Sequence, residues 1–285
     1  MQVLRPAGAP EFLELALPLL ERDEARNQLP LAVAGTVAQH PEAYDEARFW
    51  VALDGGEPVA AALHTMPYGA LLADPVSDAG LSAMLAAMAE DDPEVPGLVG
   101  MAPHIDAAAG TLAASTGRRT ERLLSQGVYA LREVRPVPRA SGAPRPAADG
   151  DRELLRRWMT DFADESLPDP GREIDRIDRT LDVRLHSDDA GYWLWEVDGE
   201  PVSLSGFGGP TPSGIRIGPV YTPPEHRRRG YATTLVADQS AWLLEHGYRF
   251  CFLYTDLENP TSNRIYEAIG YERVGDSADY RFVER

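Results

Sequence analysis

The sequence predicts an α/β protein in which a mixed β-sheet with flanking helices occurs twice. The segment "FWVALDGGEPVAAAL", which begins at Phe49, reads like "YWLWEVDGEPVSLSG", which begins at Tyr192. In both, an Asp-Gly pair between two apolar runs is a strong β-hairpin signal. Each hairpin follows a helical pattern, which favours a tandem duplication of one α/β unit, although a likeness over so few residues also arises by chance.

The helical patterns place the remaining elements and a boundary. One runs from Pro10 as "PEFLELALPLLERDEARNQL" and the other from Asp151 as "DRELLRRWMTDFADESL", with apolar residues at helical spacing in the second. "GLSAMLAAMAE" is expected to be a helix packed in the core. Residues 134–150 are rich in Pro, Ala and Gly, which is typical of a linker or an extended first strand. We therefore predict two domains, residues 1–132 and residues 133–285.

Length and charge limit the class of protein. A chain of 285 residues is long for one compact domain and can form two, each with a sizeable core. The net charge of −18 disfavours nucleic acid and anionic lipid as partners and favours cationic ones. All 27 basic residues are arginine, which excludes sites built on a P-loop lysine, a kinase lysine or a lysine Schiff base.

Cysteine and histidine give no metal-binding pattern. Cys251 is the only cysteine, so neither an internal disulfide nor a Cys-based zinc cluster can form. The six histidines show no paired metal spacing, and we expect no metal. No apolar stretch reaches the roughly 18 residues that cross a bilayer. The first residues lack the apolar core of a secretory signal, so we expect a cytoplasmic protein without membrane contact.

The segment "IRIGPVY", residues 215–221, has the β-branched and aromatic residues of a strand. Gly218-Pro219 interrupts it, and proline offers no backbone donor, so a central strand must be bulged or unpaired there. This leaves backbone groups of Val220, Tyr221 and Thr222 for a ligand. The alternative is an edge strand that ends at a turn.

The segment "EHRRRGYATTLV", residues 225–236, gathers positive charge before a predicted helix that begins near Tyr231 and is capped by Gly247. Free N–H groups at a helix N-terminus bind phosphate, Gly230 permits close backbone approach, and arginine adds permanent charge. Three adjacent arginines are also typical of a solvated turn. In this setting they predict a diphosphate cradle whose residues are Arg227, Arg228, Arg229, Gly230, Tyr231, Ala232 and Thr233.

The motif Arg227-x-x-Gly230-x-Ala232 resembles the Q/R-x-x-G-x-G/A pyrophosphate motif of GNAT-type acyl-coenzyme A (acyl-CoA) dependent N-acetyltransferases. The following "FCFLYTD" and "ENPTSNRIYEAIGYERV" resemble the second conserved block of that superfamily. Together these motifs cover residues 215–282. The segment "LYTDLENPTSNRIYEAIGY" resembles a bacterial two-domain group, which implies tandem GNAT-like units. The acyl-CoA site then lies in the C-terminal unit, and the N-terminal unit is degenerate.

The resemblance implies roles for individual residues. Val220, Tyr221 and Thr222 correspond to the strand that holds the pantetheine arm, and Tyr266 to the tyrosine that protonates the departing thiolate. Asn259 and Asn263 share a helical face with Tyr266 and would contact the cofactor. Asn259 before Pro260 is also an N-cap pattern, which explains it equally well. No base is assigned, because Tyr254 stands where many relatives have a glutamate.

The predicted function is that of an N-acetyltransferase that moves an acetyl group from acetyl-CoA directly to an amine, without a metal or a covalent enzyme intermediate. The acceptor is a small molecule or a peptide, and the acidic surface favours a cationic one. Two alternatives remain: a non-catalytic acyl-CoA sensor or scaffold, and an N-acyltransferase that uses a longer acyl donor.

Overall fold

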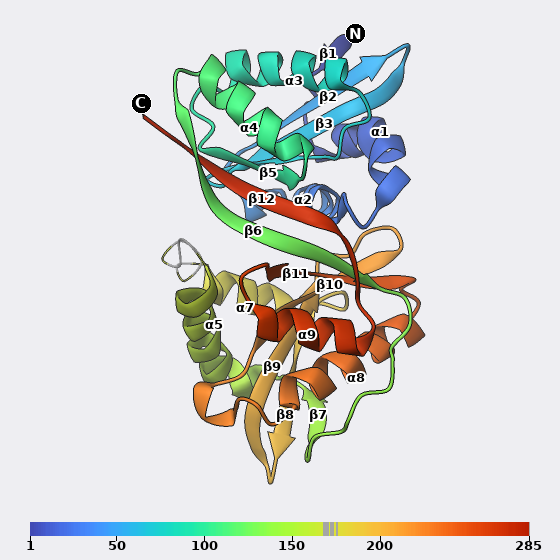
Figure 1. Ribbon diagram of the computed structural model, residues 1–285, viewed down its shortest axis with the longest axis vertical. Helices are drawn as coiled ribbons and strands as arrows, with labels where there is room; N and C mark the ends of the chain where they lie inside the picture. The colour runs from blue at the N-terminus through green and yellow to red at the C-terminus, as the bar shows by residue number, and fades with distance from the viewer. Residues whose placement is uncertain (168–170, 172–173, 175, 285) are drawn as a thin grey trace. The chain divides into compact units, whose positions relative to one another are not determined.

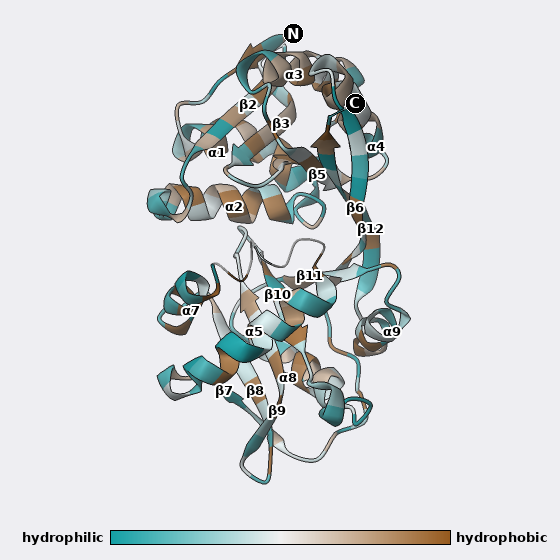
Figure 2. Ribbon diagram, turned by 90° about the vertical axis from the view of Figure 1, so that its left-hand side faces the viewer, coloured by the Kyte–Doolittle hydropathy of each residue, from teal (hydrophilic) through white to brown (hydrophobic). Residues whose placement is uncertain are grey.

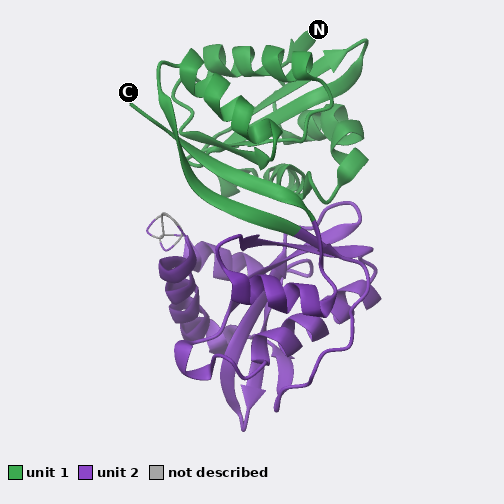
Figure 3. Ribbon diagram, in the orientation of Figure 1, with its two compact units in different colours: residues 1–128, 274–285 green, residues 129–273 purple. Residues whose placement is uncertain are grey.

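The computed structural model describes residues 1–167, 171, 174 and 176–284. The chain forms two compact units, which are coloured separately in Figure 3. Unit 1 consists of residues 1–128 and 274–285, and unit 2 of residues 129–273. Among the described residues, no helix combines the length and the apolar character that crossing a membrane requires.

Unit 1 is a mixed sheet between two pairs of helices (Figure 1). The side chains of β2 alternate between its faces, so that Phe49 and Val51 pack with one helix pair and Trp50 and Ala52 with the other. The strand order is β1-β2-β3-β4-β5-β12-β6. The strands are β1 (Gln2–Leu4), β2 (Ala47–Asp54), β3 (Glu57–Thr65), β4 (Ala70–Leu72), β5 (Gly97–Met101), β6 (Arg119–Leu131) and β12 (Glu272–Val283). The helices are α1 (Ala9–Leu20) and α2 (Gln28–Gln39) on one face, and α3 (Asp78–Asp91) and α4 (His104–Ser115) on the other.

Unit 2 repeats this layering. From the end of β6 its strand order is β11-β10-β9-β8-β7. The strands are β7 (Ala143–Pro146), β8 (Gly191–Val197), β9 (Glu200–Gly208), β10 (Gly214–Tyr221) and β11 (Phe250–Asp256). Helices α5 (Arg152–Ser166) and α7 (Ile177–Leu185) cover one face, and α8 (Tyr231–Glu245) and α9 (Pro260–Ile269) the other. In Figure 2, α5 turns a largely hydrophilic face outward, as expected for an amphipathic surface helix.

The repeated hairpins are β2–β3 and β8–β9, as predicted. Both turns have two residues, but they are placed differently relative to the Asp-Gly motif. In the second hairpin, Asp198 and Gly199 both have positive φ and form the two-residue turn. In the first, Gly55 and Gly56 take these places, and Asp54 is still paired within the ladder.

Two features differ from the sequence prediction. The helical pattern predicted over residues 10–29 is divided: α1 ends at Leu20, a short 3₁₀ turn follows, and α2 begins at Gln28. The predicted boundary near residue 132 lies close to the break at 128, but residues 274–285 belong to unit 1 rather than to the second unit. There β12 pairs antiparallel with β5 and adds Ala278, Tyr280 and Phe282 to the core of unit 1.

Candidate active site

Strands β10 and β11 of unit 2 pair over only part of their length. Their parallel register joins Gly214–Arg216 to Phe250–Phe252, whereas β10 continues to Tyr221 and β11 to Asp256. On its other side, β10 has a register shift against β9 between Ile217 and Val220. This shift includes Gly218, at φ +140, and Pro219, which has no N–H to donate. The predicted interruption of the strand is confirmed.

The end of β10 uses some of its polar groups within the chain. The Tyr221 carbonyl accepts a hydrogen bond from Ser203 Oγ at 3.2 Å, and the Thr222 carbonyl accepts one from Arg227 Nε at 2.8 Å. The prediction that the backbone groups of residues 220–222 are free is therefore wrong for these two oxygens. Each oxygen still has a second lone pair. Val220 is half-buried beside them.

The turn after β10 leads into an uncapped helix. Gly230 precedes α8 at φ +82, and in the described structure no side chain caps the helix there. The first helical bond runs from the Thr234 amide to the Gly230 carbonyl, so the amides of Tyr231, Ala232 and Thr233 have no partner within the helix. Arg228 also has a positive φ of 63°, which costs a non-glycine residue about 1–2 kcal/mol. Backbone strain of this kind is concentrated at ligand sites.

The three arginines of the turn have different surroundings. Arg227 forms an ion pair with Glu165 (2.6 Å) in addition to its bond to Thr222. Arg229 donates from Nη2 to the Glu225 carbonyl at 3.0 Å. Arg228 is exposed and has no hydrogen-bond or ion-pair partner among the described residues. The guanidinium best able to meet an anion is therefore that of Arg228.

Helix α9 begins beside the end of β11. The Asn259 side chain accepts a hydrogen bond from the Ser262 amide at 3.1 Å, which confirms the N-cap interpretation. Asn263 Nδ2 lies 3.4 Å from the Asp256 carbonyl, and its Oδ1 is buried without a partner in the described chain. A buried acceptor without a donor is costly, which makes Asn263 Oδ1 a candidate ligand contact.

Tyr266 lies on the buried side of α9. Its side chain is 8% exposed and its ring packs edge-on against Tyr271, with the ring centres 5.9 Å apart. The hydroxyl has no hydrogen-bond partner among the described residues. Burial raises the pKa of Tyr266 to about 12. At neutral pH the hydroxyl therefore stays protonated and can donate a hydrogen bond.

The comparisons with known proteins agree with this geometry. The Acetyltransferase (GNAT) family model matches residues 152–271, which lie in unit 2 and contain β10, the arginine turn, α8, β11 and α9. Residues 152–271 thus match a GNAT acetyltransferase domain and are called the GNAT domain below. A search of curated proteins finds no match.

Solved structures resemble the chain over both units. A Drosophila protein superposes with a TM-score of 0.68 at 14% identity, covering 99% of this chain and 98% of its own. A GCN5-related N-acetyltransferase from Sphaerobacter thermophilus superposes with a TM-score of 0.60 at 20% identity, covering 98% of this chain and 95% of its own. A tandem GNAT protein from the clavulanic acid biosynthesis pathway superposes with a TM-score of 0.57 at 15% identity, covering 99% of this chain and 98% of its own. At these identities the likeness shows the fold, which is that of tandem GNAT-like units.

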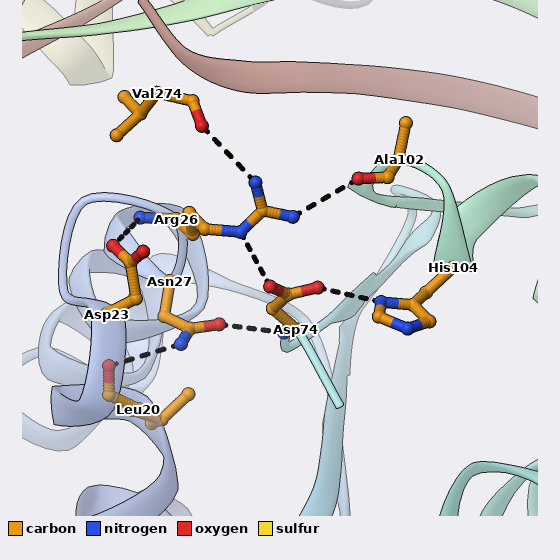
Figure 4. Close-up of polar contacts among 8 residues, drawn as sticks. All are labelled: Leu20, Asp23, Arg26, Asn27, Asp74, Ala102, His104 and Val274. Atoms are coloured by element: carbon orange, nitrogen blue, oxygen red, sulfur yellow. Dashed lines mark hydrogen bonds and ion pairs between the residues drawn. The ribbon is translucent and has the colours of Figure 1, made fainter. Parts of the chain in front are cut away.

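The corresponding strand ends of unit 1 are joined by an arginine (Figure 4). Arg26 Nε contacts Asp74, which follows β4, at 2.6 Å, and Nη2 donates to the Ala102 carbonyl, which follows β5, at 3.1 Å. Nη1 donates to the Val274 carbonyl of β12 at 3.3 Å, and Asp74 also contacts His104 Nδ1 at 3.0 Å. The ends of β4 and β5 are thus bridged, whereas β10 and β11 of the GNAT domain separate.

The helix after β4 also differs from its counterpart in the GNAT domain. Ser77 caps α3 by accepting a hydrogen bond from the Gly80 amide, and Asp78 places negative charge in the first turn. This N-terminus is satisfied by its own side chains and repels phosphate, whereas that of α8 has neither feature. Among the described residues, no group of three or more His, Cys, Asp or Glu side chains could hold a metal ion.

Sequence reasoning did not find two polar groups of the GNAT domain. Glu165, near the end of α5, binds Arg227 across 62 positions of sequence and also accepts a hydrogen bond from the Tyr221 hydroxyl at 3.3 Å. His226 lies in the turn after β10, and its Nδ1 is buried without a partner in the described chain. No local sequence pattern indicates either feature, because each depends on how the turn packs.

Proposed function

We propose that unit 2 is an N-acetyltransferase that moves an acetyl group from acetyl-CoA to an amine. The observation that carries this proposal is the uncapped N-terminus of α8 beside the separated strands β10 and β11. A helix N-terminus with free amides binds phosphate, and the positive end of the helix dipole favours negative charge. The match of residues 152–271 to the acetyltransferase family supports the same conclusion.

The turn fits the diphosphate of coenzyme A in charge and in backbone geometry. The amides from Arg228 to Thr233 supply donors, and the guanidinium of Arg228, which has no partner among the described residues, can pair with phosphate oxygens. Among the described residues, a Cβ at Gly230 would meet only Ala140, at 3.8 Å, so glycine is favoured here by the positive φ rather than by crowding from the protein. The unpartnered Asn263 Oδ1 provides a further polar contact.

The chemistry requires a neutral amine and a departing thiolate. The amine nitrogen bonds to the thioester carbonyl carbon, the carbon–sulfur bond breaks, and the nitrogen loses a proton while the sulfur gains one. Backbone N–H groups near Val220 would stabilise negative charge on the carbonyl oxygen, a contribution of about 10²–10³ in rate. The pairing of β10 with β11 covers only Gly214–Arg216, and Val220 and Tyr221 pair with β9, so the groups available for this role are those on the side of β10 that faces away from β9.

Tyr266 is the proposed donor to the sulfur. Its pKa of about 12 is above the value of about 8.5 typical of a thiol, so full release of its proton to a thiolate is uphill. A hydrogen bond from the protonated hydroxyl still stabilises the charge that develops on sulfur. Partial proton transfer of this kind contributes about 10²–10⁴ in rate.

The acceptor is proposed to be an amine with additional positive charge, on a small molecule or a peptide. The net charge of −18 attracts cations to the protein as a whole and repels anionic competitors. Because Arg26 bridges the strand ends of unit 1 and Ser77 caps α3, we propose one acyl-CoA site per chain, in unit 2.

Release of free thiol from acetyl-CoA over a panel of mono-, di- and polyamines tests the proposal. The expected result is turnover by the wild-type protein that rises with the number of amino groups and is lost in Gly230→Glu. Saturable binding of acetyl-CoA without turnover on any amine would instead favour a sensor or scaffold. Turnover only with longer acyl donors would reassign the donor.

A further inference from the structure

Two arginines of the segment that joins β10 to α8 form hydrogen bonds to backbone carbonyls of the same segment. Arg227 Nε donates to the Thr222 carbonyl at 2.8 Å, which closes the loop of residues 222–227 on itself. Arg229 Nη2 donates to the Glu225 carbonyl at 3.0 Å. These bonds fix the backbone that immediately precedes the strained Arg228 and Gly230.

Glu165 fastens this loop to α5. One carboxylate oxygen accepts from Arg227 Nη2 at 2.6 Å, and the other accepts from the Tyr221 hydroxyl at 3.3 Å. The Arg227 guanidinium also lies over the Tyr221 ring, 5.8 Å from its centre. Tyr221 is buried against Trp158 of α5, so the loop is tied to a packed part of the unit. Arg227 thus has its charge matched by Glu165 and its Nε and Nη2 groups bonded within the chain.

We propose that Arg227 and Glu165 are a positioning pair that holds the turn in its binding shape, and that Arg228 supplies the side-chain charge for the diphosphate. This inference rests on the proposed function, because it assigns roles within that site. A preformed turn binds more tightly, since the cost of ordering its backbone is met during folding rather than on binding.

Lysine and glutamine substitutions separate positioning from charge. Lysine keeps a positive charge but lacks the planar fork that lets Arg227 bond Thr222 and Glu165 together. We therefore expect Arg227→Lys and Arg227→Gln to weaken binding alike, by about tenfold, the equivalent of one charge-assisted hydrogen bond. At position 228 we expect Lys to bind within about threefold of wild type and Gln to bind about tenfold more weakly.

The assay is a calorimetric titration with coenzyme A at several salt concentrations. Salt screens contacts between exposed charges, so loss of a true phosphate contact reduces the salt dependence. The proposal predicts a reduced dependence for Arg228→Gln and an unchanged one for both Arg227 variants. It is overturned if Arg227→Lys binds like wild type while Arg227→Gln binds weakly with a reduced salt dependence.

Amide hydrogen exchange gives a second readout that needs no ligand. Arg227→Gln and Glu165→Ala should each speed exchange at the amides of residues 226 and 227, which donate to the Pro223 and Pro224 carbonyls, and the double variant should be no faster than either alone, because both remove one interaction. Arg228→Gln is the matched control and should leave this exchange unchanged. If wild type binds no coenzyme A, the proposed function fails, and the exchange data still decide whether the pair positions the turn. Unchanged exchange in both variants contradicts the proposal.

Discussion

Replacing Gly230 by alanine tests the role of the turn with a single methyl group. Gly230 has φ +82 and precedes the first turn of α8. Within the described part of the chain, the added Cβ would meet only the Ala140 Cβ, at 3.8 Å, which is ordinary van der Waals contact. The folded protein therefore has room for the methyl group, and the cost to stability comes from the backbone conformation alone.

The expected effects on stability and on binding differ in size. An alanine in the left-handed region costs about 1–2 kcal/mol. For a unit of this length that lowers the melting temperature by roughly 2–8 °C. In binding, a methyl group in the proposed cradle would disturb one or two charge-assisted bonds from amides to phosphate, each worth about 1.5–3 kcal/mol. Affinity for coenzyme A should fall by at least about tenfold.

The same helix offers a matched control at its other end. Gly247 follows α8 with φ +105, and a Cβ at this position would have no neighbour within 4 Å among the residues described. Gly247→Ala should lower the melting temperature as Gly230→Ala does, because both variants place alanine at a positive φ. It should leave coenzyme A binding unchanged, because the two glycines are separated by the length of a 15-residue helix, about 22 Å.

The two variants are compared by thermal unfolding followed by circular dichroism and by titration calorimetry with coenzyme A at a temperature where both are folded. Equal losses of stability combined with a selective loss of affinity in Gly230→Ala support the account. If both variants bind like wild type, or if both lose affinity equally, the N-terminus of α8 is not the phosphate site.

Three further predictions concern single side chains. Tyr266→Phe should lower turnover by about 10²–10⁴ with binding of coenzyme A unchanged and little loss of stability, since the hydroxyl has no partner among the described residues; equal turnover would remove it from the reaction. Burial raises the pKa of Cys251 to about 12, so the native protein should resist thiol-blocking reagents at neutral pH, and Cys251→Ala should keep its activity; rapid labelling of native protein would argue against this. The two hydrogen bonds from Arg145 hold the pKa of Asp151 in the folded protein below its usual 3.8. The ion pair therefore stabilises the fold fully above about pH 4, and this contribution is lost as the pH falls through the pKa of Asp151 in the folded protein. Asp151→Asn should therefore cost about 2 kcal/mol at pH 7 and progressively less below pH 4 in denaturant titrations, and a pH-independent difference would exclude the ion pair as the cause.

The parts of the site that sequence could predict are local. Gly230 and Gly247 bracket α8 because only certain backbone conformations begin and end a helix, and these favour glycine. Asn259 before Pro260 marked the start of α9 for the same kind of reason. Gly218-Pro219 predicted the interruption of β10, because proline removes a backbone donor wherever it stands.

Contacts between distant segments could not be read in this way. Arg26 bonds to residues 48, 76 and 248 positions away, and nothing near it in sequence indicates those partners. The pairing of β12 with β5 also joins segments that are far apart in the sequence. It could not be predicted, because the alternating apolar residues of β12 would fit any sheet with an open edge. The engagement of Arg227 by Glu165 has the same cause, and it changes which arginine is left for the phosphates.

A crystal structure of the protein with bound coenzyme A tests the central claim most directly. The account predicts diphosphate oxygens within about 3 Å of backbone amides between Arg228 and Thr233, with Arg227 still bonded to Glu165. A diphosphate bound elsewhere on the chain, with the first-turn amides of α8 left to solvent or to the protein, would contradict it.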